Sequence, residues 1–227
     1  MMYPLNAGFI IMIPAILFAL FAQNRVKSTF ARYLRVASAK GSSGRDVARK
    51  ILDQNNLQGV PIEMVQGYLA DHYDPRSQVL RLSKEVYSGT SIASISVAAH
   101  EVGHAIQHAN GYVPLSLRNA IFPIAQFGSS MAWFFVIGGF IFNFVGLIDL
   151  GILLYSAAVL FQIVTLPVEF NASNRAMQLL TDNGYLTANE VSSSRKVLNA
   201  AALTYVAAMA TAVAQLLRLI LLRNRRS

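Results

Sequence analysis

The sequence contains no cysteine, and only 13% of its residues are charged. Without cysteine, a disulfide scaffold, a cysteine-ligated zinc finger and an iron–sulfur site are excluded, so any strong metal site must use histidine and carboxylate ligands. Globular proteins carry roughly 25% charged residues. The charged fraction of this chain is about half of that, so an ordinary soluble domain is excluded. Because 54% of the residues are hydrophobic, the composition indicates a membrane protein.

Acidic residues are scarce as well, with 11 Asp and Glu against 19 Lys and Arg and a net charge of +8. A basic excess can indicate nucleic-acid binding. In a protein of the bilayer it more often orients the chain against anionic lipid. We therefore expect the lipid bilayer as a partner and no nucleic acid.

Four segments are long and apolar enough to cross about 30 Å of hydrocarbon, which takes about 20 helical residues each. These predicted spans are residues 4–22, 129–148, 150–168 and 200–222. Basic residues follow the first span and do not precede it, which is typical of a retained anchor and not of a secretory signal. Thr204, Gln215 and Arg218 interrupt the fourth span, so a full crossing and a partly interfacial helix are both open.

The predicted organisation has five parts. Residues 1–22 form the first transmembrane helix, and residues 23–118 form a small zincin-like domain on the cytoplasmic side. Residues 119–168 form a transmembrane helical hairpin, and residues 169–199 form a polar helical segment. Residues 200–227 form the last membrane helix and a basic tail. The predicted fold class is mainly α, a multi-pass helical membrane protein with a small α+β domain.

The basic residues predict the orientation of the chain. Residues 23–118 hold 12 of the 19 basic residues, and residues 169–199 hold three more. The positive-inside rule predicts that both segments face the cytoplasm. Four full crossings would then leave both termini outside, whereas Arg223, Arg225 and Arg226 favour the inside, and this conflict stays open.

The polar segment also shows strand signals. Residues 61–65 and 78–83 are predicted as two short strands that flank the turn residues Asp74 and Pro75. The expected arrangement is a short β-hairpin. Upstream of these strands, Ser42 and Ser43 are both candidates to cap a helix.

His100 and His104 enclose Glu101 in an H-E-x-x-H pattern, inside a predicted helix of about 18 residues that starts after Ser91 and stops at Asn110. Residues four apart lie one turn apart on the same helix face, so both imidazoles can bind a single Zn²⁺. Glu101 can then take the proton of a zinc-activated water that attacks a carbonyl carbon. This pattern indicates peptide hydrolysis; the alternative is two histidines that merely fill a polar helix face.

A catalytic zinc normally has three protein ligands and one open position. Glu169 is the preferred third ligand, because it ends the third apolar span on the same side as the two histidines. Its alternative role is an interfacial acid paired with Arg175. His108 stands about 12 Å along the helix axis from His100 and is expected to be a polar neighbour of the site. His72 could line the cleft or be a satisfied turn residue.

Substrate contacts are predicted more loosely. Arg175, His72 and Tyr73 are unranked candidates for stabilising the oxyanion of the transition state. If residues 78–83 form an exposed edge strand above the metal helix, an extended peptide can add to that edge. The alternative is an edge that charged side chains simply cover.

These motifs carry a family resemblance over nearly the whole chain. Residues 100–108, with residues 71–75 before them and 166–170 after them, resemble the neutral zinc metallopeptidases of prokaryotic membranes, also called YugP-like peptidases. The resemblance implies a zinc peptidase. A more distant similarity to HtpX- and Ste24-type membrane gluzincins supports a glutamate as the third ligand.

Carried onto this sequence, the resemblance implies that His100, His104 and Glu169 hold one Zn²⁺ per chain and that Glu101 is the general base. One position departs from expectation, because Asn171 stands where an aspartate is expected. An amide there can orient a ligand histidine, but it supplies no charge.

The sequence thus predicts a multi-pass zinc endopeptidase of a prokaryotic cell membrane, with its active site facing the cytoplasm. Its expected substrates are unfolded or membrane-proximal polypeptides, membrane proteins among them. Three alternatives are a peptidase for short or lipidated peptides, a non-catalytic membrane scaffold or metal-binding protein with a structural zinc, and a metal transporter. The last is disfavoured because the spans hold essentially no acidic or histidine residues.

Overall fold

The computed structural model describes residues 6–224, with side chains from residue 10 onward. The chain forms two compact units, and each is described by itself. The membrane unit comprises Met1–Gln23, Val113–Pro167 and Thr204–Ser227. The polar unit comprises Asn24–Tyr112 and Val168–Leu203.

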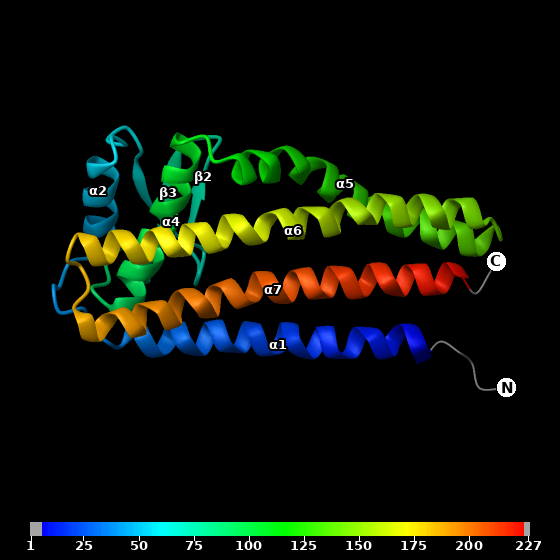
Figure 1. Cartoon of the computed structure of the whole chain (residues 1–227), viewed down its shortest axis with the longest axis horizontal. Coiled ribbons are helices and arrows are strands. Elements are labelled where there is room, and N and C mark those ends of the chain that lie inside the picture. Colours follow the sequence, from blue (N-terminus) through cyan, green and yellow to red (C-terminus); the bar gives the residue numbers. More distant parts are fainter. Residues whose placement is uncertain (1–5, 225–227) are drawn as a thin grey trace. The chain divides into compact units, whose positions relative to one another are not determined.

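Among the described residues, four helices are long and apolar enough to cross a membrane. They are α1 (Asn6–Leu34), α5 (Val113–Ile141), α6 (Val145–Asp182) and α7 (Ala188–Asn224), shown in Figure 1. In the membrane unit many large apolar side chains are exposed, as expected where lipid is the solvent; examples are Leu17, Phe127 and Leu153. The protein is therefore a multi-pass helical membrane protein, as the sequence predicts. By length and composition α7 suffices for a full crossing.

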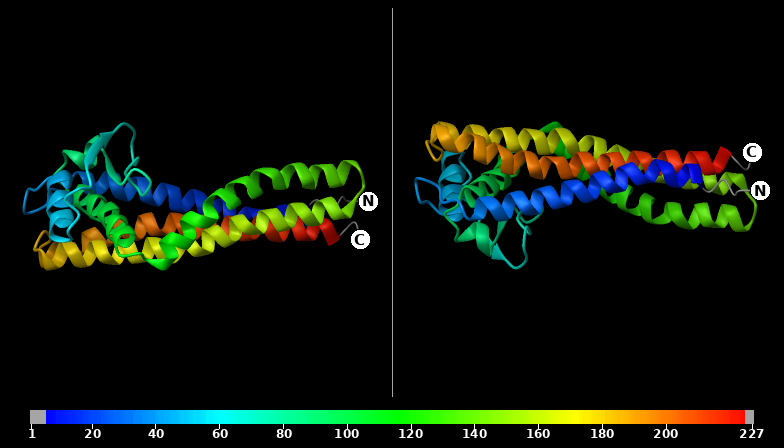
Figure 2. Two further views of the ribbon diagram at one scale, coloured as in Figure 1. Left: turned by 90° about the horizontal axis from the view of Figure 1, so that it is seen from above. Right: turned by 90° about the horizontal axis from the view of Figure 1, so that it is seen from below.

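Within the membrane unit, α5 and the first part of α6 lie side by side as a hairpin in both views of Figure 2. Their backbones meet at Gly151, where an added Cβ would lie 2.8 Å from the carbonyl oxygen of Ala132. Small residues permit such close helix packing in a membrane. In the same unit Arg223 donates from Nε to Oδ1 of Asp149 at 2.8 Å, so the end of α7 lies beside the start of α6.

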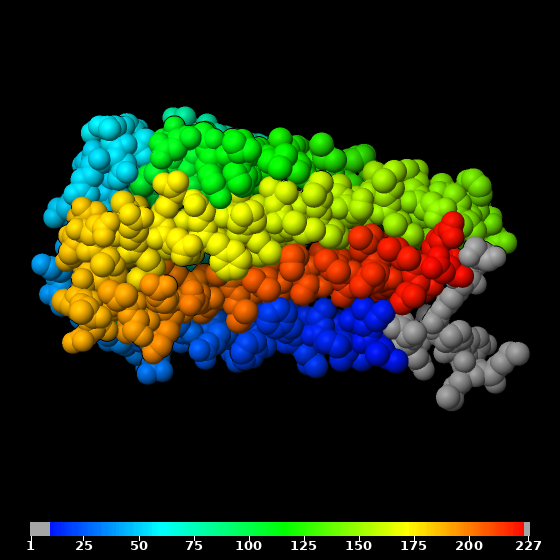
Figure 3. Space-filling model, viewed as in Figure 1, coloured from blue at the N-terminus to red at the C-terminus, as the bar shows by residue number. Residues whose placement is uncertain are grey.

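The polar unit is built around the amphipathic helix α2 (Gly44–Gln54) and the helix α4 (Ile92–Ala109), which is buried on nearly all sides. Ser43 caps α2 by accepting a hydrogen bond from the backbone N–H of Asp46, as the sequence predicts. The buried face of α2 packs against α4 in one apolar core, which also takes side chains from α1, the sheet, α6 and α7. On the surface in Figure 3, the yellow residues of α6 and the orange residues of α7 that belong to this unit lie against each other.

A three-stranded sheet completes the polar unit, with β1 (Ile62–Val65), β2 (His72–Asp74) and β3 (Val79–Ser83) in the order β1-β3-β2. The short helix α3 (Lys84–Tyr87) follows β3 directly. β1 runs parallel to β3, whereas β2 pairs with β3 in antiparallel fashion.

The predicted pairing of residues 61–65 with 78–83 as a hairpin is therefore wrong. The hairpin is β2–β3, and Asp74 belongs to β2 rather than to a turn between the predicted partners. The chain between β1 and β2 crosses over β3, which makes β3 the central strand, so the expectation that residues 78–83 form an exposed edge is wrong as well. β2 carries no run of alternating apolar residues, and for this reason the sequence pattern does not reveal it.

A pair of glycine substitutions tests the helical hairpin. Gly151→Ala should lower the thermal stability of the detergent-solubilised protein, because the new Cβ meets a neighbouring backbone oxygen at 2.8 Å. Gly138→Ala is the matched control, since the nearest atom to its Cβ would be a side-chain methyl 3.7 Å away. There the gain in helix propensity, about 1 kcal/mol, should leave stability unchanged or higher. Equal melting temperatures for the two variants would contradict the close approach.

Candidate metal centre

Helix α4 presents two imidazoles on one face. Its N-terminus is capped by Ser91, whose side chain accepts from the backbone N–H of Ser94. His100 and His104 follow one turn apart, with ring centroids 4.8 Å from each other and the ring planes at 88°. Nε2 of both rings lies within 3.6 Å of one and the same carboxylate oxygen.

Helix α6 supplies this oxygen through Glu169. Oε2 of Glu169 lies 3.3 Å from Nε2 of His100 and 3.6 Å from Nε2 of His104. One ligand atom from each of the three residues lies within 4.8 Å of the other two. These three residues are separated by up to 69 positions in the chain, and all of them belong to the polar unit.

The two helices can meet because Gly103 has no side chain. An added Cβ at this position would lie 2.9 Å from the backbone oxygen of Ala172 and 3.3 Å from its Cα. Gly103 is one of the two variable positions inside the H-E-x-x-H pattern, on the turn between the two histidines. The contact therefore holds the backbone of α6 against α4 at the place where Glu169 must reach the imidazoles.

The chemistry of these donors fits a divalent cation. Glu169 is 2% exposed, and its Oε2 makes no hydrogen bond of acceptable geometry although two imidazoles face it. A buried carboxylate oxygen without a partner is costly, and a cation bound by two histidines and a carboxylate removes that cost. Without a metal, burial alone would lower the pKa of His104, but the carboxylate of Glu169 outweighs it and the pKa is raised.

The far side of each imidazole ring is also occupied. Oε1 of Gln107 lies 3.0 Å from Nδ1 of His104, and the hydroxyl of Ser173 lies 3.2 Å from Nδ1 of His100. Both partners hold a ring so that Nε2 faces Glu169, and histidines that bind a metal are usually held in this way. The sequence analysis missed both residues. Gln107 follows His104 by three positions on the same helix face, and that spacing is the signal that could have found it.

Asn171 and Arg175 connect to this arrangement through Gln107. Oδ1 of Asn171 accepts from Nε2 of Gln107 at 2.9 Å and from Nε of Arg175 at 2.8 Å. Asn171 thus has no described hydrogen bond to a histidine, and it supports His104 through the glutamine. The described contacts of Arg175 lead to Asn171 and not to Glu169, so the alternative pairing of Glu169 with Arg175 is not what the structure shows.

Glu101 is held from the sheet side. Its Oε2 accepts a hydrogen bond of 3.0 Å from the backbone N–H of Tyr73 in β2. Just before β2, Asp71 accepts from both the backbone N–H and the hydroxyl of Ser83, which fastens this strand to the end of β3. Burial raises the pKa of Asp71 to about 6 against the opposing effect of these hydrogen bonds, and the nearby charge of Glu101 adds to the rise.

The remaining predicted residues lie around this centre without belonging to the triad. Nδ1 of His108 and the hydroxyl of Tyr73 are 2.9 Å apart and share a hydrogen bond. His72 is exposed, and its Nδ1 lies 2.8 Å from the carbonyl oxygen of Ala70. The structure therefore brings neither His72 nor His108 to the two ligand histidines.

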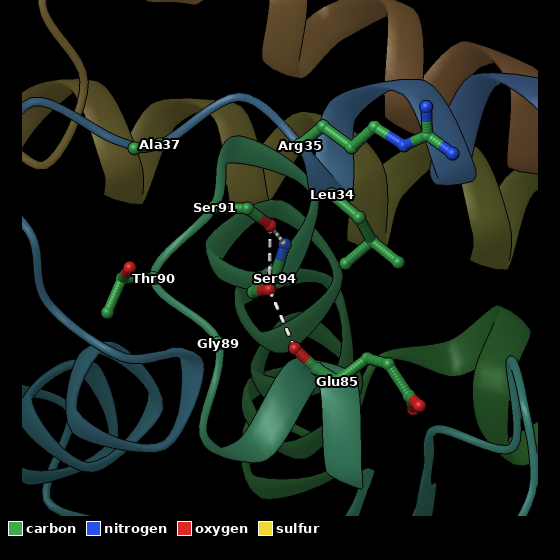
Figure 4. A pocket seen from close by; sticks show the side chains of 8 residues that line it. All are labelled: Leu34, Arg35, Ala37, Glu85, Gly89, Thr90, Ser91 and Ser94. Carbon is green, nitrogen blue, oxygen red and sulfur yellow. Dashed lines mark hydrogen bonds between the residues drawn. The ribbon is translucent and has the colours of Figure 1, made fainter.

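A hollow of about 360 Å³ lies elsewhere in the polar unit, between the end of α1, α3 and the start of α4 (Figure 4). Its hydroxyls are used internally, because those of Ser91 and Ser94 bond each other and Ser94 also donates to the carbonyl oxygen of Glu85. These bonds belong to the start of α4, and none of the three candidate ligands lines the hollow.

Four long apolar helices together with a His, His, Glu cluster that could hold a metal ion point to a membrane protein with a candidate metal site. The comparisons agree with this class. Residues 8–224 match the family described as "Putative neutral zinc metallopeptidase", and the chain belongs to this family. It is 50% identical over 210 residues to "Putative membrane protease YugP" of Bacillus subtilis (strain 168), which covers 92% of this chain and 93% of that protein. No solved structure matches the chain.

The helix contact at Gly103 gives a direct test of the centre. Gly103→Ala should weaken zinc binding by the purified protein, because the new Cβ meets the backbone oxygen of Ala172 at 2.9 Å and pushes Glu169 away from the imidazoles. Affinity is measured by competition with a chromophoric chelator. Gly59→Ala is the control in the same unit, since nothing lies within 4 Å of its Cβ. Unchanged affinity in Gly103→Ala would contradict the described approach.

Proposed function

We propose that this protein is a membrane-embedded zinc metalloendopeptidase that hydrolyses peptide bonds of unfolded or membrane-proximal polypeptides. The observation that carries the proposal is the buried, unbonded oxygen of Glu169, which faces Nε2 of both histidines while Glu101 stands beside the first of them. His100, His104 and Glu169 would hold one zinc ion.

A bound zinc ion supplies Lewis acidity, which lowers the pKa of a water molecule and polarises the substrate carbonyl. Glu101 acts as the general base and takes the proton of the attacking water. The backbone N–H of Tyr73 donates to Oε2 of this carboxylate and orients it. Glu101 then returns the proton to the nitrogen of the departing amine.

Geometry supports an extended polypeptide as the substrate. β2 is an edge strand, and its Tyr73 N–H faces Glu101 on α4, so an outer edge of the sheet lies beside the catalytic carboxylate. An extended chain that lies along this edge would meet Glu101 directly, although the N–H of Tyr73 is already bonded to Glu101 and is not available for main-chain pairing. This assignment replaces the expected use of residues 78–83, which form the central strand.

Placement near the bilayer supports membrane-proximal substrates. Glu169 lies on α6 directly after the apolar run that the sequence places at residues 150–168, and α6 continues through both without interruption. We also propose that the protein resides in a prokaryotic cell membrane with its active site facing the cytoplasm, because residues 23–118 and 169–199 carry most of the basic residues.

The C-terminal arginines oppose this orientation less than their number suggests. Arg223 forms an ion pair with Asp149, so part of the positive charge at that end of the membrane unit is balanced by the start of α6. The proposed topology has both termini and the connection between α5 and α6 on the outer side.

Separating metal binding from chemistry tests the proposed activity. Glu101→Gln should keep about one zinc per chain and lose cleavage of an unfolded protein by at least about 100-fold, because general base catalysis contributes roughly 10² to 10⁴. His104→Ala should lose the metal as well. Both are checked by metal analysis and by a casein-type proteolysis assay. If Glu101→Gln cleaves as well as the parent protein, the peptidase is excluded, and a scaffold with a structural zinc is favoured.

Orientation is accessible because the chain has no cysteine of its own. Lys40→Cys in the polar unit should react with a membrane-impermeant maleimide in inverted vesicles and not in intact cells. Phe142→Cys, at the connection between α5 and α6, should show the opposite pattern. Both native side chains are exposed, so a reversed pattern would overturn the proposed topology.

A further inference from the structure

Gln107 has no exposed surface, and its amide group is fully engaged. Nε2 donates to the carbonyl oxygen of Val168 and to Oδ1 of Asn171, each at 2.9 Å. Oε1 lies 3.0 Å from Nδ1 of His104. The side chain therefore touches a candidate metal ligand on α4 and, on α6, the residue just before Glu169.

The orientation of this amide follows from two neighbours that each have a single possible role. A backbone carbonyl can only accept, and a guanidinium can only donate. Nε of Arg175 points at Asn171, so the atom it meets must be the amide oxygen of Asn171. One atom of the Gln107 amide faces both that oxygen and the carbonyl oxygen of Val168. Because both neighbours accept, this atom must be the donor, the nitrogen Nε2.

The consequence reaches the imidazole. Oε1 of Gln107 can only accept, so Nδ1 of His104 carries a proton, and Nε2, on the side of Glu169, is the atom left to bind a metal. We propose that Gln107 is a positioning residue, which holds His104 in the tautomer that binds the metal through Nε2. This inference rests on the zinc site of the proposed function.

His100 does not have an equivalent constraint. Its Nδ1 faces the hydroxyl of Ser173, and a hydroxyl can donate as well as accept. The hydroxyl of Ser173 thus permits either tautomer of His100, whereas Gln107 permits only forms of His104 that carry a proton on Nδ1. Pre-organisation of one ligand lowers the cost of ordering the site when the cation binds.

Two substitutions at one position separate the acceptor of Gln107 from its donors. Gln107→Leu removes both, and zinc affinity of the full-length purified protein should fall about 10- to 100-fold, as is usual when the hydrogen-bond partner of a ligand histidine is lost. Gln107→Glu loses at least one donor to α6 but keeps an oxygen facing Nδ1 in either protonation state. Its zinc affinity should equal or exceed that of the parent.

Ser96→Ala is the matched control for loss of a buried hydrogen bond. Ser96 lies on α4 and is bonded to Ser194, with no described contact to the three ligands. Its zinc affinity should be unchanged. Affinity is again measured by chelator competition, and the melting temperature of each metal-free variant shows how much stability it has lost.

The outcomes are separable. A parent protein that binds no zinc refutes the proposed function itself. If the parent binds zinc and Gln107→Leu binds it equally well, the positioning role is refuted. It is also refuted if Gln107→Glu is as weak as Gln107→Leu, because the donors to α6 would then be what matters.

A measurement on the unmodified protein covers the case in which the variants do not fold. In zinc-loaded protein labelled with ¹⁵N-histidine, two-bond ¹H–¹⁵N correlations should show His104 with a protonated Nδ1 and a metal-bound Nε2. Coordination through Nδ1 of His104 would overturn the inference.

Discussion

One buried carboxylate sets the requirements for the rest of the polar unit. Glu169 is almost inaccessible, and its Oε2 has no hydrogen-bond partner among the described residues, although two imidazoles stand 3.3 and 3.6 Å away. Such a group is stable inside a protein only when a positive charge or a cation faces it. The glycine contact between α4 and α6, the amide of Gln107 and the hydroxyl of Ser173 all serve to keep the three donors converging on one point.

Different elements carry different parts of the site. α4 supplies both histidines and Glu101 within five residues, while α6 supplies the third donor and the anchors for Gln107. The sheet contributes the N–H group of Tyr73, which orients Glu101 from the opposite side. Because Asp71 ties the start of β2 to Ser83, the position of the Glu101 carboxylate depends on the packing of three short strands.

The groups behind the two histidines are neutral. Gln107 and Ser173 orient the rings without adding negative charge, so Glu169 is the one formally negative ligand among the three. A carboxylate behind a ligand histidine raises the basicity of the ring more than an amide or a hydroxyl does. The presence of Asn171 where the family resemblance suggests an aspartate is consistent with this. Its oxygen accepts from Gln107 and Arg175, so Asn171 contacts His104 only indirectly, through the amide group of Gln107.

Short-range patterns were sufficient for much of this architecture. Four apolar helices, the helix that carries the H-E-x-x-H pattern and the cap at Ser43 all depend on residues within a few turns of one another, and the structure contains them. The bounds predicted for the second span are wrong, because residues 129–148 include the connection between α5, which ends at Ile141, and α6, which begins at Val145. Residues 4 and 5 of the first predicted span lie outside the described residues. The order of the strands in the sheet could not be predicted from such short-range patterns. β2 has only three residues, and the parallel pairing of β1 with β3 depends on a crossover connection that no local sequence pattern predicts.

The sequence by itself determined a membrane protein with two imidazoles one helical turn apart, because hydropathy and the helical repeat act locally along the chain. Only the tertiary structure decided that Glu169 faces those imidazoles and that Gln107, by its bond to Val168 61 residues away, holds one of them. It also decided that Tyr73 orients Glu101. These contacts arise where α4, α6 and β2 pack together, and the energy of such packing is not encoded in any single segment.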